Sequence, residues 1–314
     1  MKKQVVVIGG GTGLSTLLKG LKQFPIDITA IVSVSDDGSS TGRLRSEFNT
    51  PAVGDIRKVL VSLAETEPLV EKLFNYRFST TSDLNGHAVG NLLLTAAAEL
   101  TGNMSEGVEA LAKVLNLKGK VVPLSEDNVV LVARMKDGSV ISGEHNITEA
   151  HKQIESISYQ NNPRVSTKAL CAIKKADLII LSMGSLFTSI IPNLLPNEVK
   201  NAIDTSGARI MYVCNMMTQP GETDGMSASQ HVGLLNDYLG NKKIDTIIVN
   251  NKKINQMLLD RYASLEQKDQ VVVDYDLLKG IKVISSNFFC IDNDTIRHDY
   301  LKLALSIFSD MLVE

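Results

Sequence analysis

The sequence predicts an α/β protein with a Rossmann-like, doubly wound and mainly parallel sheet that carries a small antiparallel β insertion. Three observations predict it. A β-branched apolar run near the N-terminus ends in glycines, strand-like runs then alternate with amphipathic helical patterns, and shorter β segments interrupt that alternation at about 119–158. Repeated β-α units build parallel sheets. With 314 residues, 44% of them hydrophobic, we expect one domain over 1–314 with an inserted β subdomain at about 119–158.

The N-terminal part predicts two strands followed by helices. The first strand is apolar and β-branched, and the helical segments repeat apolar residues at helical spacing. The predicted elements are a strand over 4–8, a helix over 13–22, a strand over 28–34, a polar loop over 35–51, and helices that begin near Asp55, end near Gly102 and cover 105–117.

The pattern changes at Gly119 and later returns to alternation. Short β segments cover 120–124, 129–135 and 140–142, and Lys136-Asp137-Gly138-Ser139 has the composition of a hairpin turn. The later predicted elements are strands over 178–182, 209–215, 246–250 and 282–285, and helices from Ser166, from Pro196, over 227–239, from Ile254 and from about Thr295.

The first strand leads into Gly9-Gly10-Gly11-Thr12-Gly13, directly before a helix. Free N–H groups at such a helix start bind phosphate, so the sequence predicts an anionic, phosphorylated ligand at Gly10, Gly11, Thr12 and Gly13. No Gly-Lys-Ser/Thr follows, and the last glycine of a dinucleotide fingerprint would fall on Leu14 or Thr16. A plain tight turn is the alternative, although a turn needs only one glycine.

A polar segment, Ser35–Arg45, follows the second predicted strand. Arg43 and Arg45 could pair with phosphate oxygens. One of the adjacent carboxylates, Asp36 or Asp37, could hold Mg²⁺ or accept a ribose hydroxyl. The alternative is a solvated loop with an aspartate helix cap.

Two further polar segments precede predicted helices. Asp55 is either an N-cap or a catalytic or metal-binding carboxylate. His87 could donate to a phosphate or act as a base, or it could be structural, and Asn91 follows it. If the protein is an enzyme, we expect Asp36, Asp37, Asp55 and His87 to be catalytic, with Mg²⁺ held by Asp37 and Asp55.

Later polar segments also follow predicted strands, where ligands bind in such sheets. Gly184 and Ser185 follow one strand, and the side chains of 215–225 can recognise a base or a sugar. Arg297-His298-Asp299 is placed at the start of the last helix. The residues expected to bind the ligand are Gly10, Gly11, Thr12, Gly13, Asp37, Arg43, Asn91, Gly184, Ser185, Asn215, Thr218, Gln219, Glu222 and Arg297.

Composition excludes several classes of partner. A net charge of −3 without a basic block argues against nucleic acid and anionic membranes. The longest apolar runs are too short for a transmembrane segment, and Met1-Lys2-Lys3 leads into a strand rather than a signal peptide. Cys171, Cys214 and Cys290 lack metal-ligand spacing, which predicts reduced thiols and a cytoplasmic location.

These segments resemble the YvcK-like gluconeogenesis factor family, which is related to the CofD 2-phospho-L-lactate transferases. The most specific string is Met217–Asp224, Met-Thr-Gln-Pro-Gly-Glu-Thr-Asp. The resemblance implies a Rossmann-like core, a cytoplasmic location, binding of a nucleotide sugar such as UDP-N-acetylglucosamine, and a role in cell shape and in growth on gluconeogenic carbon sources. Two positions depart from the family pattern: Ser39 replaces a glycine, and Ser182-Met183 replaces Gly-Pro.

Three hypotheses follow. The first is a regulatory protein that binds a nucleotide sugar or nucleotide diphosphate without chemistry, with cell-wall synthesis proteins as partners and homo-oligomerisation left open. The second is a Mg²⁺-dependent phosphotransferase that resembles CofD. The third, an NAD-binding dehydrogenase, is disfavoured by the missing third glycine.

Overall fold

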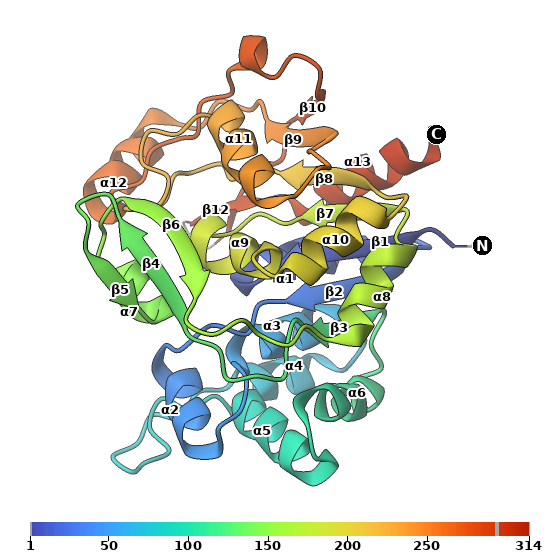
Figure 1. The fold of residues 1–314 in the computed structure, drawn as a ribbon, viewed down its shortest axis with the longest axis vertical. Coiled ribbons are helices and arrows are strands. Elements are labelled where there is room, and N and C mark those ends of the chain that lie inside the picture. Colours follow the sequence, from blue (N-terminus) through green and yellow to red (C-terminus); the bar gives the residue numbers. More distant parts are fainter. Residues whose placement is uncertain (1, 293–294, 314) are drawn as a thin grey trace.

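A seven-stranded parallel sheet forms the centre of the molecule (Figure 1). The computed structural model describes residues 2–292 and 295–313. The strand order is β10-β9-β8-β7-β1-β2-β3, and neighbouring strands pair parallel. The strands are β1 (Gln4–Gly9), β2 (Asp27–Val32), β3 (Lys120–Pro123), β7 (Leu178–Leu181), β8 (Arg209–Val213), β9 (Thr246–Asn250) and β10 (Lys282–Ser286). After β1 the chain adds β2 and β3 on one side of β1, and it then adds β7, β8, β9 and β10 on the other side. This order confirms the doubly wound, Rossmann-like fold.

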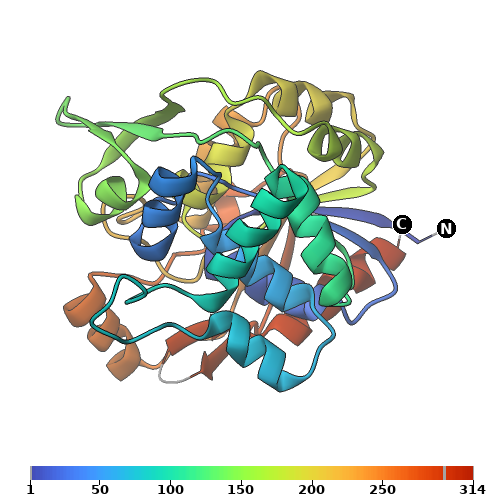
Figure 2. The ribbon, with the colours of Figure 1, turned by 90° about the horizontal axis from the view of Figure 1, so that it is seen from below.

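Helices cover both faces of this sheet. One face carries α1, which packs on α3 and α13, and the other carries α8 packed on α10 (Figure 2). The helices are α1 (Gly11–Leu21), α2 (Ser39–Phe48), α3 (Gly54–Leu63), α4 (Pro68–Asn75), α5 (Val89–Thr101), α6 (Met104–Val114), α7 (Glu144–Glu149), α8 (Thr167–Lys175), α9 (Ile191–Leu194), α10 (Asn197–Thr205), α11 (Ala228–Tyr238), α12 (Gln256–Glu266) and α13 (Tyr300–Leu312), with a π-helical turn at Leu186–Ile190 and a 3₁₀ turn at Tyr275–Leu277.

The central strands are apolar on both sides because helices cover both faces. Val5, Val6, Val7 and Ile8 of β1 are each at most 2% exposed. Leu14, Leu17, Leu18 and Leu21 of α1, spaced three or four residues apart, are buried against them. The continuous run and the helical spacing that predicted these two elements therefore reflect the same packed interface.

The antiparallel insertion consists of β4 (Leu131–Met135), β5 (Val140–Ser142) and β6 (Ile154–Tyr159), ordered β5-β4-β6. Its predicted hairpin turn is confirmed, with Gly138 at φ 83°. The expected start at Gly119 is too early, because β3 pairs parallel with β2 in the main sheet. A short apolar sequence is compatible with a strand in the main sheet or in the insertion, and only the strand that it pairs with shows to which sheet it belongs.

Three local predictions are corrected. The polar loop over 35–51 contains α2, and α4 follows α3 where no helix was expected. Ser39, where the family has a glycine, adopts φ 43° at the start of α2.

The last helix begins at Tyr300, because Arg297 and His298 belong to β12 (Thr295–His298), which pairs with β11 (Phe289–Asp292). Asp299 caps the helix by accepting a hydrogen bond from Lys302 N.

Across residues 2–292 and 295–313, no helix combines the length and the apolar character that crossing a bilayer requires.

Candidate functional site

A cleft of about 580 Å³ opens at the carboxyl ends of β1 and β7, where the direction of sheet building reverses. Ligands of open α/β sheets bind at this point, because the loops after the two strands diverge there. Ten of the predicted residues line the cleft. They are Gly10, Gly11, Thr12, Gly13, Gly184, Ser185, Asn215, Thr218, Gln219 and Arg297.

The α1 N-terminus faces this cleft without a cap. Gly10 precedes the helix in an extended conformation, and neither a side-chain cap nor an acidic residue occupies the first turn. The N–H groups of Gly11, Thr12 and Gly13 precede the first intrahelical bond, from Leu14 N to Gly10 O, and donate to no acceptor among the described residues. Free amides at the positive end of a helix dipole favour an anionic ligand.

Gly13 is required by close packing rather than by an unusual φ. A Cβ atom at Gly13 would lie 1.7 Å from the Met183 carbonyl oxygen, which belongs to the loop after β7. The α1 N-terminus and this loop therefore approach as closely as glycine allows. Gly11, in contrast, adopts φ 63°, a left-handed conformation that favours glycine.

Asn215 joins the two loops that border the cleft. Its Oδ1 accepts a hydrogen bond from Gly184 N at 2.9 Å, and its Nδ2 donates to Gly184 O at 2.6 Å. Each polar atom of the amide thus makes one hydrogen bond to backbone. Asn215 positions Gly184 at the cleft wall, and because it also lines the cleft, its second N–H remains for the predicted recognition of a base or a sugar.

Glu222 lies behind the cleft wall and is 8% exposed. Its carboxylate accepts hydrogen bonds from Ser185 Oγ, from Gln219 Nε2 at 2.5 Å and from Phe187 N at 3.3 Å. Burial raises the pKa of Glu222 to about 7, even though these donors oppose the shift. Glu222 therefore positions Ser185 and Gln219, which line the cleft, and does not line it itself.

The sequence did not predict several residues that complete the cleft from α12 and β12. Lys268 and Arg297 bring two positive side chains to its wall, and Lys268 forms an ion pair with Glu266 at 2.8 Å. The additional lining residues are Thr16, Met183, Ser189, Met216, Met217, Tyr262, Glu266, Lys268, Thr295, Ile296 and His298. Arg297 of β12 was predicted from the Arg297-His298-Asp299 segment, whereas α12 and Lys268 carry no motif that points to a site.

Comparisons with known proteins show the family of this chain. The model of the family described as 2-phospho-L-lactate transferase CofD matches residues 5–289. The chain belongs to the CofD family, among its gluconeogenesis factors. It is 46% identical over 318 residues to the gluconeogenesis factor of Bacillus subtilis, covering 100% of this chain and 99% of that protein. It is 45% identical over 309 residues to that of Halalkalibacterium halodurans, covering 98% and 96%.

A solved structure of this family has the same fold. The crystal structure of a Bacillus halodurans protein superposes with a TM-score of 0.94 at 45% identity, covering 98% of this chain and 100% of that one. The recognition of a gluconeogenesis factor from Gly9–Gly13, from the Asp-Asp-Gly segment at 36–38 and from Met217–Asp224 is thereby confirmed.

The Asp-Asp-Gly motif contributes one carboxylate, Asp36, as a neighbour of Asp55, which lies beside the glycine loop. Asp36 Oδ2 would lie 2.6 Å from a Cβ atom at Gly54, and Asp55 Oδ2 would lie 2.5 Å from one at Gly10. Burial, and then the neighbouring Asp55, raise the pKa of Asp36. Burial, and then Asp36, raise the pKa of Glu144 to about 7. These carboxylates form an acidic wall next to the phosphate-binding glycines.

Asp37, the other carboxylate of the motif, is oriented differently from the prediction. It accepts a hydrogen bond from His145 N at 2.8 Å and thereby joins the loop before α2 to α7. Asp36 is therefore the partner of Asp55. No three His, Cys, Asp or Glu side chains of the described residues are grouped to hold a metal ion. Asp36 and Asp55 fit Mg²⁺ only where phosphate oxygens of a ligand complete its coordination.

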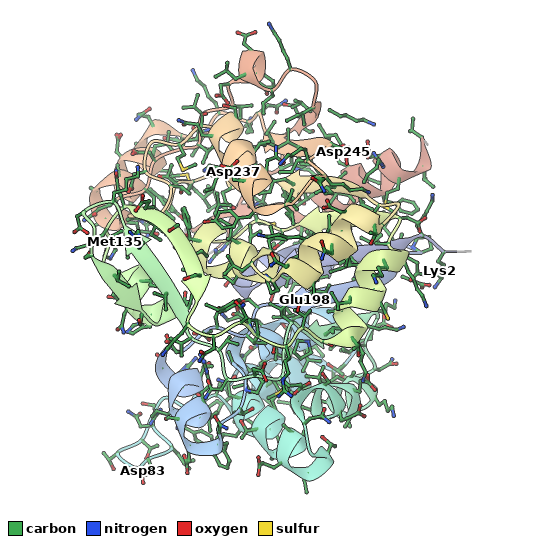
Figure 3. The ribbon with its side chains drawn as sticks, viewed as in Figure 1. Lys2, Asp83, Met135, Glu198, Asp237 and Asp245 are labelled. Atoms are coloured by element: carbon green, nitrogen blue, oxygen red, sulfur yellow. The ribbon has the colours of Figure 1, made fainter. Side chains whose placement is uncertain are left out.

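The predicted arginines have structural roles. Arg43 donates to the carbonyl oxygens of Asp83 and Asn85, on a loop at the lower end of the molecule (Figure 3). Arg45 is 5% exposed and donates to Asp36 O at 2.8 Å and to Asn128 Oδ1 at 2.6 Å. Arg43 and Arg45 therefore brace the loops on either side of α2, and neither lines the cleft.

His87 and Asn91 meet at Ser40, outside the cleft. His87 Nδ1 lies 3.0 Å from Ser40 Oγ, and Asn91 Nδ2 donates to the same oxygen at 3.1 Å. Burial, and then the positive charge of Arg43, lower the pKa of His87. This cluster packs α2 against α5, and the structure does not bring the predicted His87 and Asn91 into the lining of the cleft.

Proposed function

We propose that the protein binds a nucleotide sugar, such as a UDP-N-acetylglucosamine-like compound, in the cleft and acts as a regulatory factor in growth on gluconeogenic carbon sources. The uncapped α1 N-terminus carries this proposal, because it offers free amides to a diphosphate at the switch point of the sheet. Lys268 and Arg297 supply the opposing positive charge. Thr218 and Gln219 also line the cleft and would contact the base or the sugar.

The cellular part of the proposal rests on the relatives, whose name is gluconeogenesis factor. We propose that it works in the cytoplasm, contributes to cell shape and contacts cell-wall synthesis proteins. A protein that senses a nucleotide sugar would pass that signal to such a partner through the loops that border the cleft.

The binding test compares nucleotide diphosphate compounds by thermal shift and calorimetry. We expect UDP-N-acetylglucosamine to raise the Tm more than UMP does, because UMP lacks the second phosphate that reaches the glycine loop. A ligand at a hundred times its Kd stabilises the fold by about 2.7 kcal/mol. GDP- and adenine-linked compounds serve to identify the base.

Arg297→Ala is expected to weaken this binding at least tenfold, because it removes a charge-assisted contact to an anion, worth about 1.5–3 kcal/mol. Arg261→Ala is the matched control, since Arg261 is an exposed arginine of α12 that is absent from the cleft wall. Equal loss in both variants, or no binding of any nucleotide diphosphate by the unaltered protein, contradicts the proposal.

We propose a CofD-like, Mg²⁺-dependent transferase as the second candidate, because Asp55 lies directly beside Gly10 of the phosphate-binding loop and Asp36 is its acidic neighbour. An acceptor hydroxyl would attack the diphosphate and lose its proton to a neighbouring carboxylate, one P–O bond would form, and the bond to the departing nucleoside monophosphate would break. The carboxylates would hold Mg²⁺ together with the phosphate oxygens.

Asp55→Asn separates the two candidates. A transferase loses turnover by at least a hundredfold, measured as Mg²⁺-dependent release of nucleoside monophosphate by chromatography. A pure binder shows no turnover and keeps its affinity within about threefold, since Asp55 already neutralises part of its charge with Lys58 at 3.0 Å. Asp83→Asn, on the distant loop of Figure 3, is the control for a general effect of charge.

A further inference from the structure

A second cavity, which we call the lysine groove, lies against the sheet between α6 and α8. Its volume of about 650 Å³ is in the range of small-molecule sites. Its floor includes Val5 and Val6 near the start of β1 and Val121 at the start of β3. Because the cleft lies at the carboxyl ends of the strands, the lysine groove is a separate site at the opposite end of the sheet.

The interior of the lysine groove is aliphatic. Val108 and Val121 are 1% and 5% exposed, and none of the described lining residues is aromatic. The aliphatic lining residues are Val5, Val6, Val108, Ala112, Leu117, Val121, Val122 and Ala172. A nucleotide base would find no ring to stack on here. A flexible alkyl chain would bury apolar surface against these side chains.

The rim of the lysine groove is positively charged. Lys113, Lys120, Lys168 and Lys175 line it. Lys168 is neutralised by two carboxylates, Glu106 at 3.2 Å and Glu109. The other three lysines take part in no ion pair within residues 2–292 and 295–313. Glu109 is the acidic residue among the lining, so the rim keeps an excess of positive charge that an anionic head group would complement.

We propose that the lysine groove binds a long-chain fatty acid, with its alkyl chain between α6 and α8 and its carboxylate at Lys113, Lys120 and Lys175. An aliphatic interior beneath a cationic rim matches a ligand that is apolar along its length and anionic at one end. The site is independent of the nucleotide cleft, since the two cavities share no lining residue.

Cys171 provides a direct test, because this thiol is exposed and lines the lysine groove. In the full chain carrying Cys290→Ser, the remaining Cys214 is buried, so a thiol reagent reports on Cys171. We expect palmitate, kept below its micelle concentration, to slow labelling of Cys171 at least fivefold and saturably. Hexadecanol, which has the same chain without the charge, should need at least tenfold higher concentration.

Lys120→Glu combined with Lys175→Glu should raise the palmitate concentration needed for protection at least tenfold. Lys72→Glu, on the exposed surface of α4, should leave it unchanged. Ala172→Phe fills the interior and should abolish protection, and circular dichroism confirms that each variant is folded.

Four outcomes would overturn the proposal. They are no protection by palmitate, equal protection by hexadecanol, protection that survives the double lysine variant, and protection only by anionic vesicles or by an acidic amphipathic peptide. Calorimetry with nucleotide sugars on the same variants keeps the two sites distinguishable. A groove variant that loses palmitate should still bind the nucleotide, and failure of nucleotide binding leaves the palmitate result intact.

Discussion

Replacing Gly13 with alanine is expected to lower the stability of the protein and to weaken nucleotide binding at least tenfold. The added Cβ atom would lie 1.7 Å from the Met183 carbonyl oxygen, so α1 or the loop after β7 has to move. Overpacking of this kind costs about 1–3 kcal/mol and sometimes more. Because the contact is with backbone, which cannot rotate away, we expect about 3 kcal/mol, or a fall in Tm of about 4–5 °C for a chain of 314 residues.

The binding loss follows from the same displacement. The free N–H groups of Gly11, Thr12 and Gly13 are aimed by the position of α1, and a shift of about 1 Å misaligns several hydrogen bonds at once. Chemical unfolding measures the change in stability, and calorimetry with the best nucleotide measures the change in affinity.

Gly233→Ala is the matched control for Gly13→Ala. Gly233 also lies inside a helix, α11, but an added Cβ atom there meets nothing within 4 Å. Alanine is the better helix former, so this change should stabilise the protein by about 0.5–1 kcal/mol. If Gly13→Ala behaves like Gly233→Ala, the close approach between α1 and Met183 is not what requires glycine.

The protein should become less stable as the pH rises from about 4.5 to about 7, because of Glu222. Burial raises the pKa of Glu222 from 4.5 to about 7 in the folded state. Below pH 4.5 the group is protonated in both states and contributes no pH dependence. Above that value the unfolded chain releases the proton first, so the contribution of Glu222 falls until the folded-state pKa is reached, by about 3 kcal/mol in total. Glu144, whose pKa is also raised to about 7, acts in the same direction.

Glu222→Gln is expected to flatten this dependence, measured as the free energy of unfolding in urea between pH 5.5 and 8. Glutamine can still accept from Ser185 Oγ and Phe187 N, and the Gln219 amide can turn to receive its new N–H donor. Glu198→Gln, at an exposed position on α10 (Figure 3), should leave the slope unchanged. A Glu222→Gln protein with the full slope of the unaltered chain would rule out Glu222 as its source.

The strands and helices of the core were predictable because burial requires apolar residues at regular spacing along the sequence. Val5–Ile8 is a continuous apolar run because helices cover both faces of β1, and the leucines of α1 repeat at helical spacing for the same reason. By contrast, α2 was missed. Two of its few inward residues are Leu44 and Arg45, and buried hydrogen bonds of the arginine replace an apolar stripe.

The sequence by itself determined the family, the parallel sheet and the glycine loop with its uncapped helix, because each depends on residues that are close together along the chain. Only the tertiary structure decided that Asp36 rather than Asp37 adjoins Asp55, that Arg43 braces a loop and His87 packs against α2, and that Lys268 and Tyr262 reach the cleft. Those outcomes depend on where a side chain points and on which distant segments come together. Local residue patterns indicate burial and turn geometry, but they indicate neither the direction of a side chain nor the contacts between distant segments.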